Sequence, residues 1–196
     1  AGQKCSACSR VIVDNRIRDK FITRLKKAVD SIVVGDSLDY ATFVNPVIDD
    51  LAVRRLVSDQ HQLAKEIQQS AGRIVCYSPD ASENVEPMVV EIPTKVALQG
   101  NSMFEKELFG PILHIVGYDD EETALSLFNQ TNYGLTGGIF SQSQNEIDRL
   151  TSRFECGNIY VNRTITGARV DIEPFGGFKM SGTGPKAGGK TYLSSF

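Results

Sequence analysis

Short apolar runs alternate with longer segments of helical periodicity, and this alternation limits the fold more than any other feature of the sequence. Runs rich in β-branched residues lie at residues 9–13, 73–77, 88–92, 112–117, 135–141 and 157–162. Helices, with apolar side chains every three or four positions, are expected at residues 17–32, 49–70, 119–130 and 145–154. Asp49 and Asp50 can cap the second helix. This order predicts an α/β fold, with a mainly parallel sheet and flanking helices.

Composition excludes several classes of protein. The net charge of −3, with scattered lysines and arginines, gives no electrostatic footprint for nucleic acid. No apolar run approaches the ~20 residues that a membrane helix needs. Four cysteines in 196 residues are too few for a disulfide scaffold, so a reducing compartment is expected. That compartment would be the cytoplasm, or the mitochondrial matrix in a eukaryote.

The first residues carry the strongest chemical feature. Cys5 follows a Gly-Gln-Lys run and precedes two small residues, which predicts an exposed bend with an available backbone N–H. A thiolate there can attack a carbonyl, and the N–H helps to hold the resulting oxyanion. A free cysteine is also often a small buried hydrophobe, so this run alone leaves both interpretations open. A second distinctive run, Pro-Phe-Gly-Gly-Phe-Lys-Met-Ser-Gly, occupies residues 174–182.

Several motifs together resemble the aldehyde dehydrogenase family. They lie, in the order found in that family, at residues 2–6 (Gly-Gln-Lys-Cys-Ser), 107–111 (Glu-Leu-Phe-Gly-Pro), 132–135 (Asn-Tyr-Gly-Leu) and 174–177 (Pro-Phe-Gly-Gly). Residues 166–169 and 181–189 are similar to those of Δ1-pyrroline-5-carboxylate dehydrogenases, also called glutamate-γ-semialdehyde dehydrogenases. These residues especially resemble the aldehyde dehydrogenase part of bifunctional proline-utilisation enzymes.

The resemblance implies a nucleophile and a cofactor. Cys5 matches the family's cysteine, whose thiolate adds to an aldehyde; hydride then passes to NAD, and water hydrolyses the thioester. Glu107 would accept hydrogen bonds from the nicotinamide ribose, and Phe109 would pack near the nicotinamide ring. Without the resemblance, an exposed Glu107 before a core aromatic Phe109 is the commoner arrangement in general.

The resemblance also implies a substrate, L-glutamate γ-semialdehyde, which is oxidised to L-glutamate in proline degradation. The hydroxyl of Ser6 and the backbone of Gly167 and Ala168 would hold its α-carboxylate. Phe175 would line the aldehyde pocket. From the residues alone, Gly167 and Ala168 are a tight turn and Phe175 is a core aromatic residue beside a glycine turn.

Part of the family's machinery lies upstream of the cysteine. The nucleotide-binding domain, the glutamate that acts as general base and the asparagine of the oxyanion hole find no counterpart here. Residues 1–196 are therefore expected to be a fragment holding the catalytic domain, inactive in isolation and part of a homo-oligomer at full length. The partner is a small-molecule aldehyde. No metal site is predicted, and His114, inside an apolar strand, is expected to be a hydrogen-bonded structural histidine.

Three alternatives remain from the sequence. Cys5 and Cys8 form a Cys-x-x-Cys arrangement, which could serve thiol redox exchange. A degenerate fold could act as a scaffold or binding module. An aldehyde dehydrogenase with another substrate is the third alternative, because Asp171 and Glu173 would repel an anionic substrate if they faced it. Both carboxylates are expected to point outward.

Overall fold

The chain divides into two compact units. A computed structural model describes residues 2–78, 85–100, 102–169 and 172–196. The first unit comprises Ala1–Lys4 and Cys8–Asp120, and the second comprises Cys5–Ala7 and Glu121–Phe196. The short segment around Cys5 therefore belongs with the C-terminal part of the sequence, although it lies near the N-terminus.

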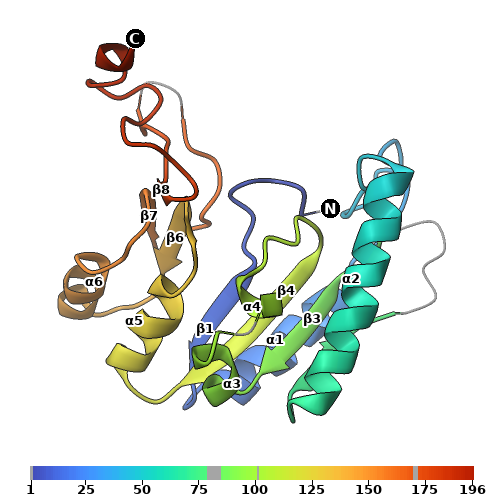
Figure 1. Cartoon of the computed structure of the whole chain (residues 1–196). Coiled ribbons are helices and arrows are strands. Elements are labelled where there is room, and N and C mark those ends of the chain that lie inside the picture. Colours follow the sequence, from blue (N-terminus) through green and yellow to red (C-terminus); the bar gives the residue numbers. More distant parts are fainter. Residues whose placement is uncertain (1, 79–84, 101, 170–171) are drawn as a thin grey trace. The chain divides into compact units, whose positions relative to one another are not determined.

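The first unit is built on a four-stranded sheet (Figure 1). Its elements, in chain order, are β1 (Arg10–Asp14), α1 (Arg18–Asp30), α2 (Asp50–Gln69), β2 (Arg73–Cys76), β3 (Met88–Ile92), α3 (Thr94–Leu98), α4 (Ser102–Glu105) and β4 (Ile112–Tyr118). The strand order is β1-β4-β3-β2. β4 pairs in parallel with β1 and β3, while β2 pairs antiparallel with β3 at one edge. The mainly parallel sheet predicted from the sequence is therefore confirmed.

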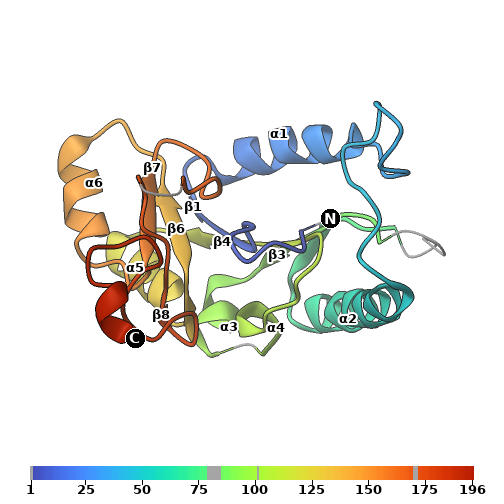
Figure 2. The same cartoon turned by 90° about the horizontal axis from the view of Figure 1, so that it is seen from above.

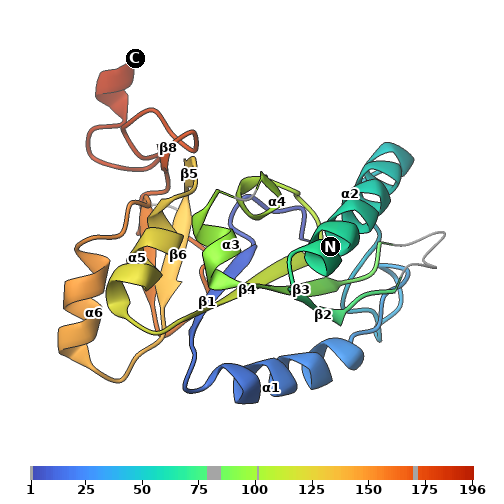
Figure 3. The same ribbon diagram turned by 60° about the horizontal axis from the view of Figure 1, so that its bottom comes forward.

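Helices cover both faces of this sheet. Figures 2 and 3 show α1 on one face, with α2 and α3 on the opposite face. On the α1 side, Ile22 packs with Val13, Val89 and Ile115 in one apolar cluster. Because β3 is enclosed from both sides, four of its five residues are buried, and its sequence is apolar at every position except Glu91 rather than alternating.

The second helix begins where the sequence predicts. The side chain of Asp49 accepts a hydrogen bond of 2.7 Å from the backbone N–H of Ala52, so Asp49 is the N-cap. Apolar residues at helical spacing, including Leu56, Leu63 and Ile67, are buried along its inner face. The helix ends before Ala71, whose φ of 58° is incompatible with a continuing right-handed helix.

The second unit contains two small sheets. Its elements are α5 (Glu121–Asn129), β5 (Tyr133–Gly134), β6 (Thr136–Ile139), α6 (Gln144–Thr151), β7 (Asn158–Val161), β8 (Phe178–Lys179) and a 3₁₀ turn (Leu193–Ser195). β6 and β7 are parallel and joined through α6, whereas β5 and β8 are antiparallel. Phe128 of α5 stacks on Phe154 at 4.0 Å between ring centroids.

The structure also contains elements that the sequence does not predict. α3, α4 and β8 have two to five residues each, too few for a helical or alternating pattern to be recognised. The helices of the described residues include none that is long and apolar enough to cross a membrane.

Candidate active site

Cys5 lies at an exposed turn. Residues 4–7 form a bend before β1 begins, and Cys5 is exposed to solvent. The next residue, Ser6, is buried, with 3% of its surface exposed. Both belong to the second unit, together with Gly167, Ala168 and Phe175. The structure thus places five of the seven predicted site residues in one unit.

The other cysteines are poorly suited to thiolate chemistry. All four are free thiols, so Cys5 and Cys8 are not joined by a disulfide. The Sγ of Cys8 donates to the carbonyl of Arg10 at 3.4 Å, and although the residue as a whole is exposed, desolvation raises the pKa of its thiol. Burial also raises the pKa of Cys76, and it raises the pKa of Cys156 to about 11.

The turn at Gly167 and Ala168 is held by hydrogen bonds to the residues on either side of it, Thr166 and Arg169. Gly167 has a φ of 85°, a left-handed conformation that favours glycine. Nη2 of Arg163 donates to the carbonyl of Thr166 at 3.2 Å, and the N–H of Arg169 donates to Oε2 of Glu173 at 2.9 Å. Among the described residues, the N–H groups of Gly167 and Ala168 have no hydrogen-bond acceptor. Gly167 is exposed and Ala168 is half-buried.

From the sequence we expected the Glu173 side chain to point outward, but the structure places it between two arginines. Its side chain is 23% exposed and lies between two guanidinium groups, 3.3 Å from Arg163 and 3.4 Å from Arg169. The hydrogen bond from the N–H of Arg169, together with these charges, lowers the pKa of the carboxyl group. The carboxylate is therefore charged but neutralised locally. Asp171, the other acidic residue of this loop, lies outside the described residues.

Phe175 sits in a loop clamped by Asn158. The side-chain amide of Asn158 donates to the carbonyl of Pro174 at 2.9 Å and accepts from the N–H of Gly176 at 3.3 Å. Phe175 itself exchanges two backbone hydrogen bonds with Ala187, of 3.0 and 2.9 Å. It is half-buried. Phe175 is thus fixed on both sides by groups distant in the sequence.

Asn158 was not identified from the sequence. The only signal is a polar residue at the start of a strand that otherwise reads Ile-Tyr-Val. The preceding residue, Gly157, must be glycine, because a Cβ at this position would lie 1.7 Å from the carbonyl oxygen of Gly176. The close approach of these two backbones requires glycine and brings Asn158 within reach of the loop.

Glu107 and Phe109 lie in the first unit and are both exposed, while Leu108 between them is buried. The interpretation of Phe109 as a core aromatic residue is therefore wrong. Phe109 has a φ of 51°, which is rare for a bulky residue and is found mainly where the surroundings enforce it. The sequence gives no sign of this conformation.

An ion network supports the turn at Glu107. Nη1 of Arg55 donates to the carbonyl of Leu108 at 2.7 Å and to Asp59 at 3.0 Å. Asp59, 7% exposed on the inner side of α2, also accepts from Lys106 at 2.8 Å. Because the Leu108 carbonyl and the Lys106 ammonium are both held, the residues on either side of Leu108 are directed to the surface.

His114 is only partly hydrogen-bonded, in contrast to the sequence prediction. It is 2% exposed, and its Nδ1 lies 3.3 Å from the carbonyl of Ser9. Its Nε2 has no partner among the described residues. The ring meets Phe104 edge-on at 6.0 Å. Burial lowers the pKa of His114 to about 4, so the ring is neutral at physiological pH.

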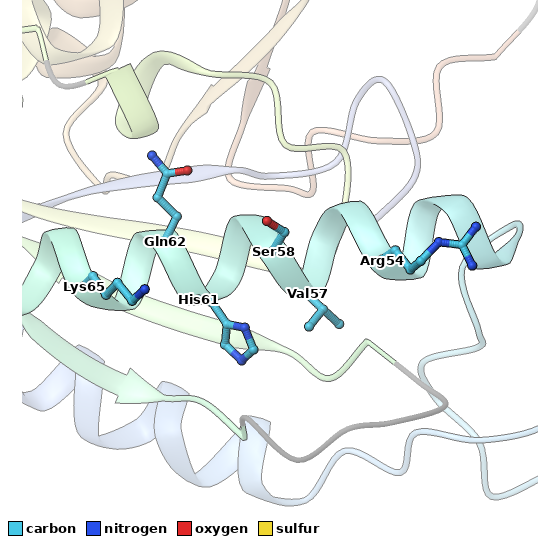
Figure 4. Close-up of a pocket in the computed structure, with 6 residues that line it drawn as sticks. All are labelled: Arg54, Val57, Ser58, His61, Gln62 and Lys65. Carbon is cyan, nitrogen blue, oxygen red and sulfur yellow. The ribbon is translucent and has the colours of Figure 1, made fainter.

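A separate pocket runs along α2 and has little catalytic character. It is lined by side chains of this one helix: Arg54, Val57, Ser58, His61, Gln62 and Lys65. Figure 4 shows Val57 and His61 on one side of the helix and Ser58 and Gln62 on the other, so the polar groups do not converge. In the part of the chain that the structure describes, no three His, Cys, Asp or Glu side chains are grouped to hold a metal ion.

The sequence and the fold both match known aldehyde dehydrogenases. The model of the aldehyde dehydrogenase family matches residues 1–196. 1-Pyrroline-5-carboxylate dehydrogenase of Geobacillus sp. strain WCH70 is 35% identical over 194 residues, which cover 98% of this chain and 36% of the relative. The enzyme of the same name from Bacillus licheniformis is 36% identical over 198 residues, 99% of this chain and 36% of that protein.

Solved structures give the same result. Proline utilization A from Bdellovibrio bacteriovorus superimposes with a TM-score of 0.87 at 37% identity, covering 98% of this chain and 19% of that one. Betaine aldehyde dehydrogenase from Staphylococcus aureus, in a structure with NAD+, superimposes with a TM-score of 0.84 at 28% identity, covering 100% of this chain and 39% of that one. The chain spans about a third of the length of its curated relatives. With a family match over its whole length, it belongs to the aldehyde dehydrogenase family.

Proposed function

We propose that this chain supplies the catalytic thiol and the substrate-binding residues for NAD-dependent oxidation of L-glutamate γ-semialdehyde to L-glutamate, a step of proline degradation. The observation that carries the proposal is the combination of an exposed Cys5 with a Gly167–Ala168 turn whose N–H groups are not engaged by the described residues. Relatives named 1-pyrroline-5-carboxylate dehydrogenase, at about 35% identity, support the choice of substrate.

Cys5 performs the covalent step. Its thiolate adds to the aldehyde carbon, a C–S bond forms, and the carbonyl oxygen takes up the negative charge. We assign the stabilisation of that oxyanion to the backbone N–H of Cys5. A thioester formed at this sulfur can still be opened by water, which regenerates the thiolate and releases the new carboxylate.

Glu107 and Phe109 fit a nicotinamide cofactor. The exposed Glu107 carboxylate offers two acceptor oxygens, which suit the paired hydroxyls of a ribose. Phe109 is 39% exposed and held in a rare backbone conformation, which suits a ring that packs against a flat heterocycle. NAD, when bound, supplies the acceptor for the hydride that leaves the aldehyde carbon. The contribution of this chain is to orient the nicotinamide half.

The carboxylate of the substrate is assigned to the second unit. Two adjacent backbone N–H groups at a turn with positive φ form a concave site for an anion. Ser6 adds a hydroxyl donor from the segment next to the nucleophile. Phe175, held by Asn158, contributes an apolar surface for the aliphatic carbons between the carboxylate and the aldehyde.

The test compares two aldehydes in a protein of the relatives' full length that carries this chain. NADH absorbance is followed with pyrroline-5-carboxylate and with butanal, which lacks the α-carboxylate. We expect kcat/KM to be at least about a hundredfold higher for the carboxylated substrate, because a site built to hydrogen-bond a substrate group discriminates against an analogue that lacks that group. Equal turnover of both would keep the aldehyde chemistry and remove the carboxylate assignment of Ser6, Gly167 and Ala168.

The isolated chain of 196 residues is expected to be inactive. It spans about a third of the length of its curated relatives, so neither tight NAD binding nor thioester hydrolysis is expected from these residues alone. Formation of NADH by this chain alone would contradict this part of the proposal.

A further inference from the structure

We propose that Glu173, supported by Arg163, is the positioning residue that shapes the turn at Gly167 and Ala168 for a substrate carboxylate. This inference rests on the function proposed above. Glu173 does not contact the substrate in this account. It acts through the backbone of Arg169, which follows the two N–H groups that would bind the carboxylate.

The turn is fixed at both ends and left open in the middle. Arg163 holds the carbonyl of Thr166 at the first end, and Glu173 holds the N–H of Arg169 at the second. The backbone N–H of Glu173 in turn donates to the carbonyl of Arg169 at 2.9 Å. The N–H groups of 167 and 168, between these restrained residues, have no acceptor among the described residues, which is what an anion site requires.

Arg163 itself is anchored. Its guanidinium lies over the ring of Tyr160 at 4.8 Å from the centroid, and Tyr160 is a buried residue of β7. Stacking on a fixed aromatic ring limits the rotamers of a long side chain and reduces the entropy lost when it binds Thr166 and Glu173. The turn is thereby connected to a strand of the second unit.

Arg163 and Arg169 also reduce the electrostatic repulsion between Glu173 and an anionic substrate. A carboxylate at position 173 would repel an anionic substrate, and two arginines beside it offset that charge. All five groups involved belong to the second unit: Tyr160, Arg163, Thr166, Arg169 and Glu173. Glu173 can therefore provide a strong acceptor for the Arg169 N–H without making the site repulsive.

Glu173→Ala in the full-length protein tests the inference. We expect kcat/KM for pyrroline-5-carboxylate to fall about tenfold, the effect of losing one charge-assisted hydrogen bond, while kcat/KM for butanal changes less than threefold. Amide hydrogen exchange of residues 164–169 should become faster. Glu173→Gln keeps an oxygen acceptor for Arg169 and should recover most of the loss. Glu121→Ala removes a carboxylate of α5 that pairs with Arg149 of α6, and this variant should behave as wild type.

The outcomes separate this inference from the proposed function. If the wild type shows no preference for the carboxylated aldehyde, the proposed function fails and the positioning role fails with it. If the wild type shows the preference and Glu173→Ala retains it, only the positioning role is overturned. An equal loss for both aldehydes would also overturn it, because a merely structural residue has that effect.

Discussion

Two turns of this molecule are assigned to binding, and they are held in different ways. The Glu107 turn in the first unit rests on Asp59, a buried carboxylate that joins two cations beneath it. The turn at Gly167 and Ala168 in the second unit rests on Glu173, which is 23% exposed between two partly exposed arginines. The carboxylate at the centre of the first network is buried, whereas the carboxylate at the centre of the second network is partly exposed to solvent. Breaking the first should cost stability, and breaking the second should cost substrate selectivity.

The largest expected effect is acid sensitivity of the first unit, which contains both histidines. His114 has a folded-state pKa of about 4 against 6.5 for the free side chain. Between these values the unfolded chain binds a proton that the folded chain does not, so stability falls as pH drops from 6.5 to 4. The loss is about 3 kcal/mol over that range.

Urea unfolding at several pH values between 6.5 and 5 would measure this slope. His114→Gln should flatten it, whereas His61→Gln, a change at an exposed histidine, should leave it unchanged. A slope that survives His114→Gln would show that another group is responsible.

Asp59→Ala should have the next largest effect. It leaves Arg55 and Lys106 without their shared carboxylate and loosens the support of the Leu108 carbonyl. We expect a loss of about 2 kcal/mol in the free energy of unfolding, less than for a fully enclosed pair because both cations are about half exposed. Urea denaturation gives the value; a change below about 0.5 kcal/mol would contradict the distinction between the two turns.

Asn158→Ala removes both hydrogen bonds that clamp the Phe175 loop. A cost of about 1–2 kcal/mol in unfolding free energy is expected, since the Pro174 carbonyl and the Gly176 N–H lose their partner. Asn145→Ala, at an exposed position of α6, is the matched control and should change stability little. If the two variants unfold at the same urea concentration, Asn158 does not stabilise the loop.

Glu173→Ala should change stability least. Its arginine partners are 43% and 64% exposed, and pairs of this kind contribute less than about 1 kcal/mol. The comparison of the two turns becomes sharper if this variant unfolds like the wild type yet loses selectivity for the carboxylated aldehyde. A loss of stability as large as that of Asp59→Ala would show that both networks stabilise the folded protein equally, which would contradict the distinction between the two turns.

Much of the fold could be predicted because its elements are long and periodic. The 20-residue α2 has an apolar stripe and an aspartate cap, and β3 is apolar at four of its five positions and closed by Pro93. These features depend on neighbours in the sequence. Elements of two to five residues, such as α3 and β8, have no such period and could not be recognised.

The candidate site was predicted only in part, because some of its features depend on neighbouring residues and others depend on residues far away in the sequence. The bend at Cys5 follows from small residues beside it, but the supports of the site come from elsewhere in the chain. Asn158 reaches a loop 16 residues away, and Arg55 reaches a carbonyl 53 residues away. Phe109 has a positive φ, and no local sequence pattern indicates it.

The central claim is that the thiol of Cys5 performs the chemistry. The most direct measurement is NADH formation from pyrroline-5-carboxylate by the full-length protein, comparing wild type, Cys5→Ala and Cys8→Ala. We expect Cys5→Ala to lower kcat more than about a thousandfold, since no other group replaces the nucleophile, and Cys8→Ala to retain most of the activity. Activity that survives in Cys5→Ala, or that is lost equally in Cys8→Ala, would contradict the account.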